Sequence, residues 1–336
     1  MKTNINYKVE KSEIEGMTFL KVIAEKCYFN VTLCDLGASI YEVFFNQKRM
    51  TLTPRFPSDF KKTGVYHGKT IGRVANRIKD AKINIDGTQY SLDPNENGNT
   101  LHGGRNGIST KYFDYKIIDN NNIFIIEFHY VSPHLEAGFP ETADIYVRYG
   151  FPKEFDTPHF YIVYDVDVDR KTPIKLTNHA YWNLGGELKD LSLSLNSNRY
   201  VKVNEKNLLF EEIVKLSNGK GPAFNHTEVR RIIGTEHFPN GVDNYFYFLK
   251  GKDDEEKIQL VLENDHSAMI MFTNFPGVQL YTDNFYDETS FFKTKAHRRR
   301  AIAIEPSEDP FNSGNLNFGE HYHRFICYQF FDQTNK

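Results

Sequence analysis

The chain has 336 residues, of which 40% are hydrophobic and 25% are charged, proportions that exclude a disordered or fibrous protein. A formal net charge of -3 gives no electrostatic reason to expect binding to nucleic acid or to an anionic membrane. Its three cysteines are too few and too scattered for a disulfide framework or a zinc cluster, which favours a reducing compartment. The N-terminus lacks the apolar core of a signal peptide, and no apolar run reaches the roughly 18 residues of a membrane span. We therefore expect a cytoplasmic protein.

Alternating apolar and polar residues predict strands along most of the chain, in agreement with an aromatic content of 15%. The first turn signal is Asp86-Gly87, which lies between two short apolar runs and predicts a tight hairpin. Residues 205–215 form the only persuasive helical stretch. The predicted strands, in chain order, cover residues 122–131, 160–168, 268–273, 300–305 and 324–331.

This pattern predicts an all-β protein with mostly antiparallel strands and few short helices. Residues 1–336 contain no linker, low-complexity tract or fixed-period repeat, so we expect one domain. Many strands with irregular connections favour a sandwich over a strict up-and-down barrel.

Three motif-like features do not predict a cofactor or a metal site. Residues 64–70 resemble a phosphate-binding loop, but their glycine spacing is one residue short and no βαβ pattern surrounds them. The glycines between residues 103 and 107 do not fit a dinucleotide fingerprint. His321 and His323 would share one face of a strand, yet no carboxylate or cysteine pattern completes a metal site around them. We expect this pair to be an ordinary surface feature.

Separated segments combine polar groups with the small and aromatic residues expected of a sugar pocket. Four carry the chemistry: GRVANRI (72–78), NTLHGG (99–104), NHAYWN (178–183) and AIAIE (301–305). They are accompanied by YHGKTIGR (66–73), LDPNENGNTLHGG (92–104), GVDNYF (241–246) and PGVQLYTDN (276–284). In this order the segments resemble the aldose 1-epimerase (galactose mutarotase) family, and the resemblance extends over about residues 37–330.

The resemblance implies a galactose mutarotase-like β-supersandwich and a cofactor-free reaction that interconverts the α and β anomers of a free aldose. It places Glu305 on the general base, His179 on the general acid, and His102 on a second histidine near the ring oxygen or anomeric hydroxyl. The implied substrate-binding residues are Asn76, Arg77, His102, His179, Tyr181, Asp243, Gln279 and Glu305.

Each of these residues also has an ordinary structural interpretation. A lone histidine between apolar residues usually forms structural hydrogen bonds, and Glu305 could end a strand in solvent. Asp243 could stabilise a turn, and residues 76–77 could form a surface pair. The motif context favours the functional interpretation, because the segments occur together and in order.

The sequence departs from the family pattern in three places. Pro306 and Ser307 follow the glutamate where the family commonly has Thr-Gln. Ala180 and Trp182 replace a serine and a phenylalanine, a change we expect to alter the shape of the pocket, and a Pro-Thr-Gly stretch near residues 208–211 is absent. These departures bear on substrate preference more than on the reaction.

The first hypothesis is therefore an aldose 1-epimerase that acts on a neutral monosaccharide such as galactose or glucose. Alternatives are an epimerase for a disaccharide or a sugar phosphate, and a non-catalytic sugar-binding or regulatory protein on the same fold. Retention of both His179 and Glu305 favours the enzyme, because a binding protein needs no proton-transfer pair. Whether the chain forms a homodimer is left open.

Overall fold

The computed structural model describes residues 3–54, 56–62, 64–204, 208–216, 223–249, 257–284 and 299–334. Strands of its three main sheets pair antiparallel, which confirms the predicted fold class. The helical segments in these ranges are short: α1 (Pro57–Phe60), α2 (Val229–Ile232), η1 (Lys79–Ala81), η2 (Ile108–Thr110), η3 (Glu136–Gly138) and η4 (Leu188–Asp190). No described helix has the length and apolar character needed to cross a membrane.

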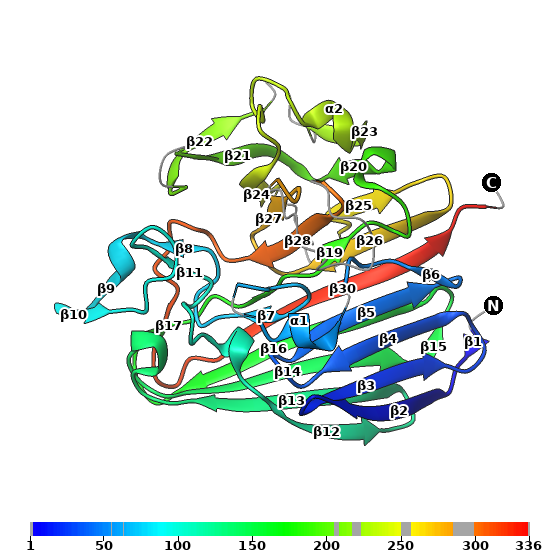
Figure 1. Cartoon of the computed structure of the whole chain (residues 1–336), viewed down its shortest axis with the longest axis horizontal. Coiled ribbons are helices and arrows are strands. Elements are labelled where there is room, and N and C mark those ends of the chain that lie inside the picture. Colours follow the sequence, from blue (N-terminus) through cyan, green and yellow to red (C-terminus); the bar gives the residue numbers. More distant parts are fainter. Residues whose placement is uncertain are drawn as a thin grey trace.

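The largest sheet of the described residues has nine strands (Figure 1). In spatial order they are β12 (Asp114–Asp119), β13 (Ile123–Ser132), β14 (Ala143–Pro152), β16 (His159–Val168), β30 (Tyr322–Asp332), β26 (Ser267–Thr273), β25 (Leu260–Glu263), β20 (Ser192–Leu195) and β23 (Phe224–Glu228). A five-stranded sheet contains β2 (Tyr7–Ile14), β3 (Met17–Ala24), β4 (Phe29–Cys34), β5 (Ser39–Phe45) and β6 (Lys48–Arg49).

A six-stranded sheet carries much of the candidate site. Its order is β19 (Tyr181–Trp182), β28 (Ile302–Ser307), β27 (Gly277–Tyr281), β24 (Asp243–Phe248), β21 (Ser197–Val203) and β22 (Phe210–Lys215). Two-strand pairs complete the described architecture: β1 (Thr3–Asn4) with β15 (Glu154–Phe155), β7 (Thr70–Ile71) with β18 (Thr177–Asn178), β8 (Arg77–Ile78) with β11 (Thr100–Leu101), β9 (Lys82–Ile85) with β10 (Thr88–Ser91), and β17 (Thr172–Pro173) with β29 (Asn315–Leu316).

The main apolar core lies between the five-stranded and nine-stranded sheets. Phe29 on β4 contacts Phe160 on β16 with ring centroids 6.4 Å apart, and it contacts Phe330 on β30 at 5.7 Å. Strand β16 shows why the sequence forms this layer, since every even residue from 160 to 168 is buried and the odd ones are not. The largest cluster of buried apolar side chains contains residues from nearly the whole length of the chain, from Ile5 to Phe330.

The strand predictions agree with the structure apart from one boundary. Residues 122–131, 160–168, 268–273 and 324–331 correspond to β13, β16, β26 and β30. The strand expected at 300–305 is β28, which begins at Ile302 and continues through Pro306 to Ser307. Pro306 is tolerated because β19 pairs with β28 only at Ile302 and Ala303. The hairpin prediction is confirmed as well: Asp86 and Gly87, with φ of 50° and 87°, join β9 to β10.

The helix predicted at residues 205–215 is wrong. Residues 205–207 lie outside the described ranges, and Phe210–Lys215 is strand β22. It pairs with β21 through Tyr200 with Val214 and Val201 with Ile213. Backbone pairing with an existing strand, together with two β-branched residues, outweighs the weak local preference for a helix.

Candidate active site

Three neighbouring strands bring polar side chains from distant parts of the chain to one face. Gln279 on β27 pairs with Glu305 on β28, and Asp243 on β24 pairs with Tyr281 on β27. Residues two apart on a strand share a face, so Gln279 and Tyr281 point the same way. Gln279 Nε2 donates a hydrogen bond to Asp243 Oδ1 at 2.8 Å. These strands therefore form one wall of a polar site.

The opposite wall depends on the loop that follows β11. His102, Gly103 and Gly104 adopt φ of 53°, 83° and 86°, which turns the chain back sharply. A Cβ atom at Gly103 would lie 1.9 Å from the Gly72 carbonyl oxygen, so only glycine fits there. The turn brings His102 against Asn76, whose backbone N–H donates to His102 Nδ1 at 3.2 Å.

That hydrogen bond fixes the tautomer of His102. A backbone N–H can only donate, so Nδ1 accepts and the proton of the neutral ring lies on Nε2. Burial lowers the pKa of His102 well below its ordinary value, and the charges of His179 and Arg77 lower it further. At neutral pH His102 is therefore an uncharged ring whose Nε2–H can donate to a ligand.

His179 and Glu305 form a buried pair. The backbone of His179 is held by two hydrogen bonds, from Gly68 N–H to its carbonyl at 2.8 Å and from its own N–H to the Lys69 carbonyl at 3.0 Å. His179 Nε2 lies 3.3 Å from Glu305 Oε1, and the two side chains are 5% and 3% exposed.

Burial shifts the two pKa values of this pair in opposite directions. It lowers the pKa of His179 to about 4 and raises the pKa of Glu305 well above its ordinary value. The negative charge of Asp243 also raises the pKa of Glu305, whereas Arg77 lowers it. Both shifts oppose an imidazolium beside a carboxylate. Over a wide pH range His179 Nε2 and the Glu305 carboxyl therefore share a single proton, with one group as its donor and the other as its acceptor.

Arg77 and Gln279 are placed to contact a polar ligand. Arg77 Nη2 lies 3.2 Å from Glu96 Oε1 and 3.9 Å from Asp243 Oδ2, and its side chain is 8% exposed. Gln279 Oε1 is buried and has no hydrogen-bond partner among the described residues. A buried acceptor without a hydrogen bond lowers the stability of the folded protein. A hydroxyl group of a ligand that donates to Gln279 Oε1 would remove this penalty.

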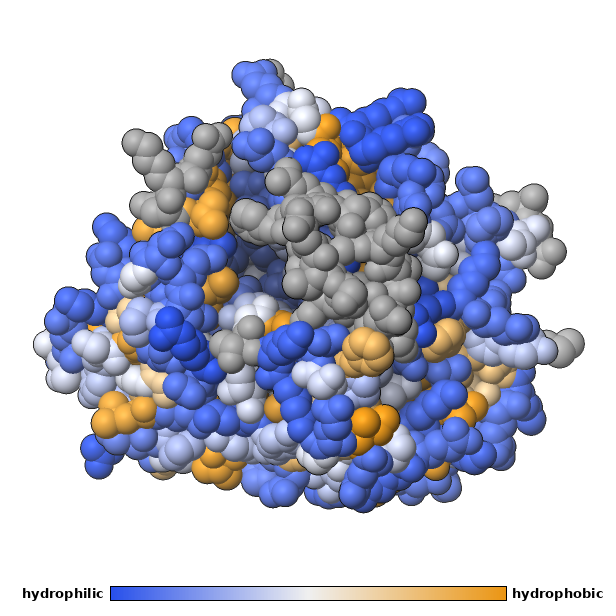
Figure 2. Space-filling model, in the orientation of Figure 1, coloured by the Kyte–Doolittle hydropathy of each residue, from blue (hydrophilic) through white to orange (hydrophobic). Residues whose placement is uncertain are grey.

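These side chains line a cavity of about 210 Å³. Its size is below the roughly 300–1,000 Å³ of pockets that hold drug-sized ligands, which suits a small polar molecule. All eight residues that the sequence assigned to the site line it. The complete described lining is Gly64, Tyr66, Asn76, Arg77, Glu96, Leu101, His102, His179, Tyr181, Asp243, Gln279, Tyr281 and Glu305. The face of the molecule in Figure 2 is hydrophilic over most of its visible surface and hollowed near its centre.

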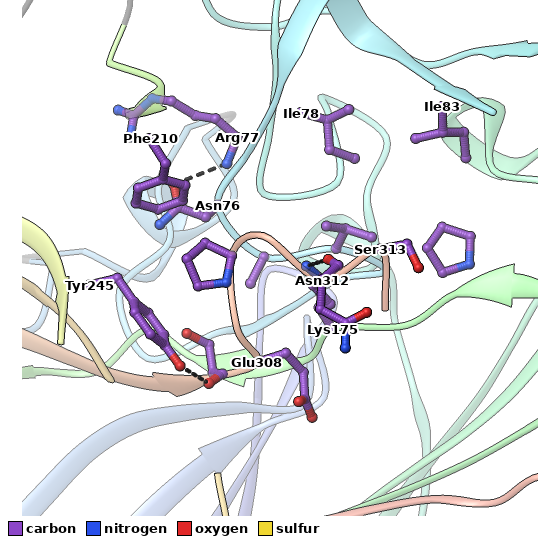
Figure 3. A pocket seen from close by; sticks show the side chains of 15 residues that line it. Asn76, Arg77, Ile78, Ile83, Lys175, Phe210, Tyr245, Glu308, Asn312 and Ser313 are labelled. Carbon is purple, nitrogen blue, oxygen red and sulfur yellow. Dashed lines mark hydrogen bonds between the residues drawn. The ribbon is translucent and has the colours of Figure 1, made fainter. Parts of the chain in front are cut away.

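A second cavity of about 220 Å³ is also lined by Asn76 and Arg77 (Figure 3). Its charged groups are already engaged: Lys175 Nζ donates to the Asp309 carbonyl at 2.9 Å, and Glu308 accepts from Arg324 at 2.6 Å. The Tyr245 hydroxyl donates to the Ser307 carbonyl at 3.1 Å. Among the described lining residues, Lys175 and Glu308 are thus already bound by other groups, so we assign the proton-transfer chemistry to the cavity around His179 and Glu305.

Of the five lining residues that sequence reasoning missed, three contribute an aromatic ring or a charge. The ring of Tyr66 lies 4.8 Å from that of His102, centroid to centroid, and Glu96 pairs with Arg77. Tyr281 adds a second ring 6.2 Å from that of Tyr181. All three lie inside the segments that carried the family resemblance, which was the available signal.

The expected effect of Ala180 and Trp182 on the pocket is wrong. Neither residue lines the cavity. Trp182 is fully buried and its ring lies 4.8 Å from that of Tyr328, within the main core. Strand alternation explains this, because Tyr181 faces the cavity and its two neighbours therefore face away.

His102, His179 and Glu305 could also hold a metal ion by geometry, since each offers one ligand atom and these atoms lie within 4.8 Å of one another. The positive charge of Arg77 acts on both His102 and Glu305 and opposes a second cation there. An acid and a base at this spacing serve proton transfer without a metal.

Comparisons with known proteins bear on the family and the fold of the chain. The family model described as aldose 1-epimerase matches residues 21–329. The chain is 30% identical to the galactose mutarotase of Sus scrofa over 238 residues, which are 69% of this chain and 66% of that protein, just under two thirds of its length. It is 26% identical to the aldose 1-epimerase of Escherichia coli K12, covering 89% of this chain and 91% of that protein. The crystal structure of a galactose 1-epimerase from Lactobacillus acidophilus superimposes with a TM-score of 0.85 at 19% identity, covering 98% of this chain and 99% of that one. That likeness confirms the predicted fold.

Proposed function

Because the chain belongs to the aldose 1-epimerase family, we propose that it interconverts the α and β anomers of a free aldose such as galactose or glucose. One observation carries the proposal: His179 Nε2 and Glu305 Oε1 lie 3.3 Å apart in a buried polar cavity. The reaction needs an acid and a base that act on two oxygens bonded to the same carbon. A closely spaced pair with opposite roles meets that need.

The proposed reaction conserves protons. In the reacting complex the one proton of the pair lies on His179 and Glu305 is ionised, a form that the charge of Arg77 favours. Glu305 then takes the proton of the anomeric hydroxyl, the bond from the anomeric carbon to the ring oxygen breaks, and His179 gives its proton to the departing ring oxygen. The open aldehyde rotates about its bond to the next carbon. Closure on the other face returns both protons by the reverse transfers, so no cofactor is consumed.

The remaining residues position the sugar. His102 donates from Nε2–H close to the acid and base, while Arg77 and Asp243 bind hydroxyl groups through charge-assisted hydrogen bonds. Asn76 places His102, and the free Oε1 of Gln279 accepts from a hydroxyl. Tyr181 supplies an apolar surface for a face of the sugar ring.

The charge of the cavity favours a neutral sugar over a sugar phosphate. Arg77 is the one lysine or arginine among the described lining residues, and it is already paired with Glu96. Arg73 lies elsewhere, with its guanidinium donating to Ser132 and Pro133. A doubly negative phosphate would therefore meet at least as much negative as positive charge.

We also infer a single cytoplasmic domain without a required metal. The described cysteines Cys27, Cys34 and Cys327 are all free thiols, as a reducing compartment would keep them. One continuous apolar core with members from both ends of the chain supports one cooperative unit. We expect a single calorimetric unfolding transition and activity that survives dialysis against a chelator.

Polarimetry on freshly dissolved α-galactose, α-glucose and maltose, with and without the protein, tests the proposed function. Faster approach to anomeric equilibrium would support it and rank the sugars. Binding of a sugar without acceleration would favour the non-catalytic sugar-binding protein. Acceleration confined to sugar phosphates would overturn the argument from cavity charge.

A further inference from the structure

Two histidines and two aspartates gather on the outer face of the nine-stranded sheet, away from the candidate active site. Asp165 on β16 pairs with His323 on β30, and His321 and Asp167 lie one residue beyond the next pair, Val166 with Tyr322. Val166 and Tyr322 are buried, so the four polar side chains share the opposite face. A carboxylate beside these histidines could not be predicted from the sequence pattern, because Asp165 lies 158 positions from His323 along the chain.

The geometry of three of these side chains is that of a small ligand set. Asp165 Oδ1 lies 2.9 Å from His321 Nε2 and 2.7 Å from His323 Nδ1. The three atoms lie within 4.8 Å of one another. Two imidazole nitrogens and a carboxylate oxygen are ligands that Zn²⁺ prefers, at about 2.0–2.2 Å each. Small side-chain rotations would bring all three onto one ion.

The surrounding groups orient two of the three ligands. Asp167 Oδ1 lies 2.9 Å from His321 Nδ1 and accepts its proton, so Nε2, which donates to Asp165 in the metal-free protein, is the nitrogen that can give up its proton and bind the ion. A carboxylate behind a ligating histidine is the usual outer shell of zinc sites. Arg148 Nη1 donates to Asp165 Oδ2, which leaves Oδ1 toward the histidines. Glu127 in turn accepts from Arg148 Nε at 2.5 Å and offsets its charge.

We propose that His321, His323 and Asp165 bind a divalent cation of the zinc class, with Asp167 as the positioning residue for His321. The two histidine side chains are 50% and 54% exposed, which gives the ion access from solvent and leaves room for water as a fourth ligand. The bound ion cross-links β16 and β30 in the middle of the largest sheet. It binds the folded chain and thereby raises its melting temperature.

An ordinary histidine–aspartate pair in the same sheet provides the control. His129 Nε2 on β13 lies 2.6 Å from Asp144 Oδ1 on β14. This pair belongs to no three-ligand group within the described residues. His129→Ala removes one surface imidazole and one such pair without touching the proposed ligands.

Isothermal titration of the intact protein with ZnCl₂ tests the site. We expect one saturable site that is lost in the His321→Ala/His323→Ala double variant and retained in His129→Ala. Asp167→Ala should weaken it by about 10- to 100-fold, the usual effect of removing such a carboxylate. Zinc should raise the melting temperature of the wild type but not of the double variant.

Two further readouts prevent confusion with other sites or with misfolding. Saturating galactose should leave this titration unchanged, whereas zinc held by His102, His179 and Glu305 would be displaced. Histidine ring NMR signals of the wild type report the ligands directly, so a double variant that fails to fold does not end the test. The proposal is overturned if zinc leaves the His321 and His323 signals unshifted, or if the folded double variant binds zinc like the wild type.

Discussion

At the residue scale, the carboxyl group of Glu305 carries the proposed reaction. Glu305→Gln keeps the shape of the side chain and removes its ability to accept a proton. Turnover should fall by about 10²-fold or more while sugar affinity changes little, since general acid–base groups typically contribute about 10²- to 10⁴-fold. His179→Asn should produce a similar loss.

Glu308→Gln is the matched control for that experiment. Glu308 lies three residues further on, pairs with Arg324 and lines the neighbouring cavity. Its kcat should stay within about twofold of the wild type. Steady-state polarimetry measures both variants, and a Glu305→Gln enzyme as active as Glu308→Gln would reject the assignment of the base.

The pH dependence of turnover follows from the single proton that His179 and Glu305 share. Below a pH of about 4 His179 is protonated as well, so the pair holds two protons. Above the raised pKa of Glu305 the pair holds none. Turnover should therefore fall on both sides of a plateau.

Asp243→Asn should move the alkaline limb of that profile to lower pH. The charge of Asp243 raises the pKa of Glu305, so its removal lowers that pKa. The same variant should raise KM, because Asp243 also contacts the sugar in the proposed complex. An alkaline limb that stays in place in kcat profiles would show that this limb does not belong to Glu305.

At the scale of elements, the loop after β11 is the most constrained part of the site. Gly103→Ala would add a Cβ atom 1.9 Å from the Gly72 oxygen at a φ of 83°, so the loop must move and carry His102 with it. We expect kcat to fall at least tenfold and the melting temperature to drop.

Gly87→Ala provides the comparison. Gly87 has a similar φ of 87° but nothing within 4 Å of an added Cβ, so it should lose about 1 kcal/mol of stability and no activity. If Gly103→Ala and Gly87→Ala had equal kcat, the position of His102 would not depend on the shape of the loop after β11.

The same elements show how far the sequence could predict the structure. The alternation in β16 specified a buried face, and the ordered motifs found all eight assigned residues of one cavity. Residues 210–215 carry no comparable signal, because their strand exists only through pairing with β21. The Asp165 and His323 pair was also invisible, since contacts between distant strands depend on sheet order.

At the scale of the whole molecule, three buried histidines make stability depend on pH. Burial lowers the folded-state pKa of His67, His102 and His179. Below a pH of about 6.5 these histidines are therefore protonated in the unfolded chain but still neutral in the folded chain. The free energy of unfolding should fall as the pH drops from about 6.5 toward 4.

Glu305 and Asp243 oppose this trend, since their raised pKa values add stability that is lost as pH rises above their unfolded values of about 4.3 and 3.9. On unfolding, the three histidines take up protons and the two carboxylates release them, so the chain takes up protons overall. The free energy of unfolding therefore changes by about 1.4 kcal/mol per pH unit for each proton taken up. Urea titrations from pH 5 to 7 should show this slope.

His67→Phe, which keeps a ring against Tyr181, should reduce the change of unfolding free energy with pH. An unchanged slope would mean that His67 titrates normally in the folded chain.

The most direct test of the central claim is NMR exchange spectroscopy on galactose at anomeric equilibrium, which measures the rate at which each anomer becomes the other. With the wild type we expect exchange cross-peaks between the α and β signals at a rate proportional to enzyme concentration, and with Glu305→Gln only the uncatalysed rate. Exchange that the wild type does not accelerate for galactose, glucose or maltose, despite measurable binding, would contradict the assignment of His179 and Glu305 as the proton-transfer pair of an epimerase.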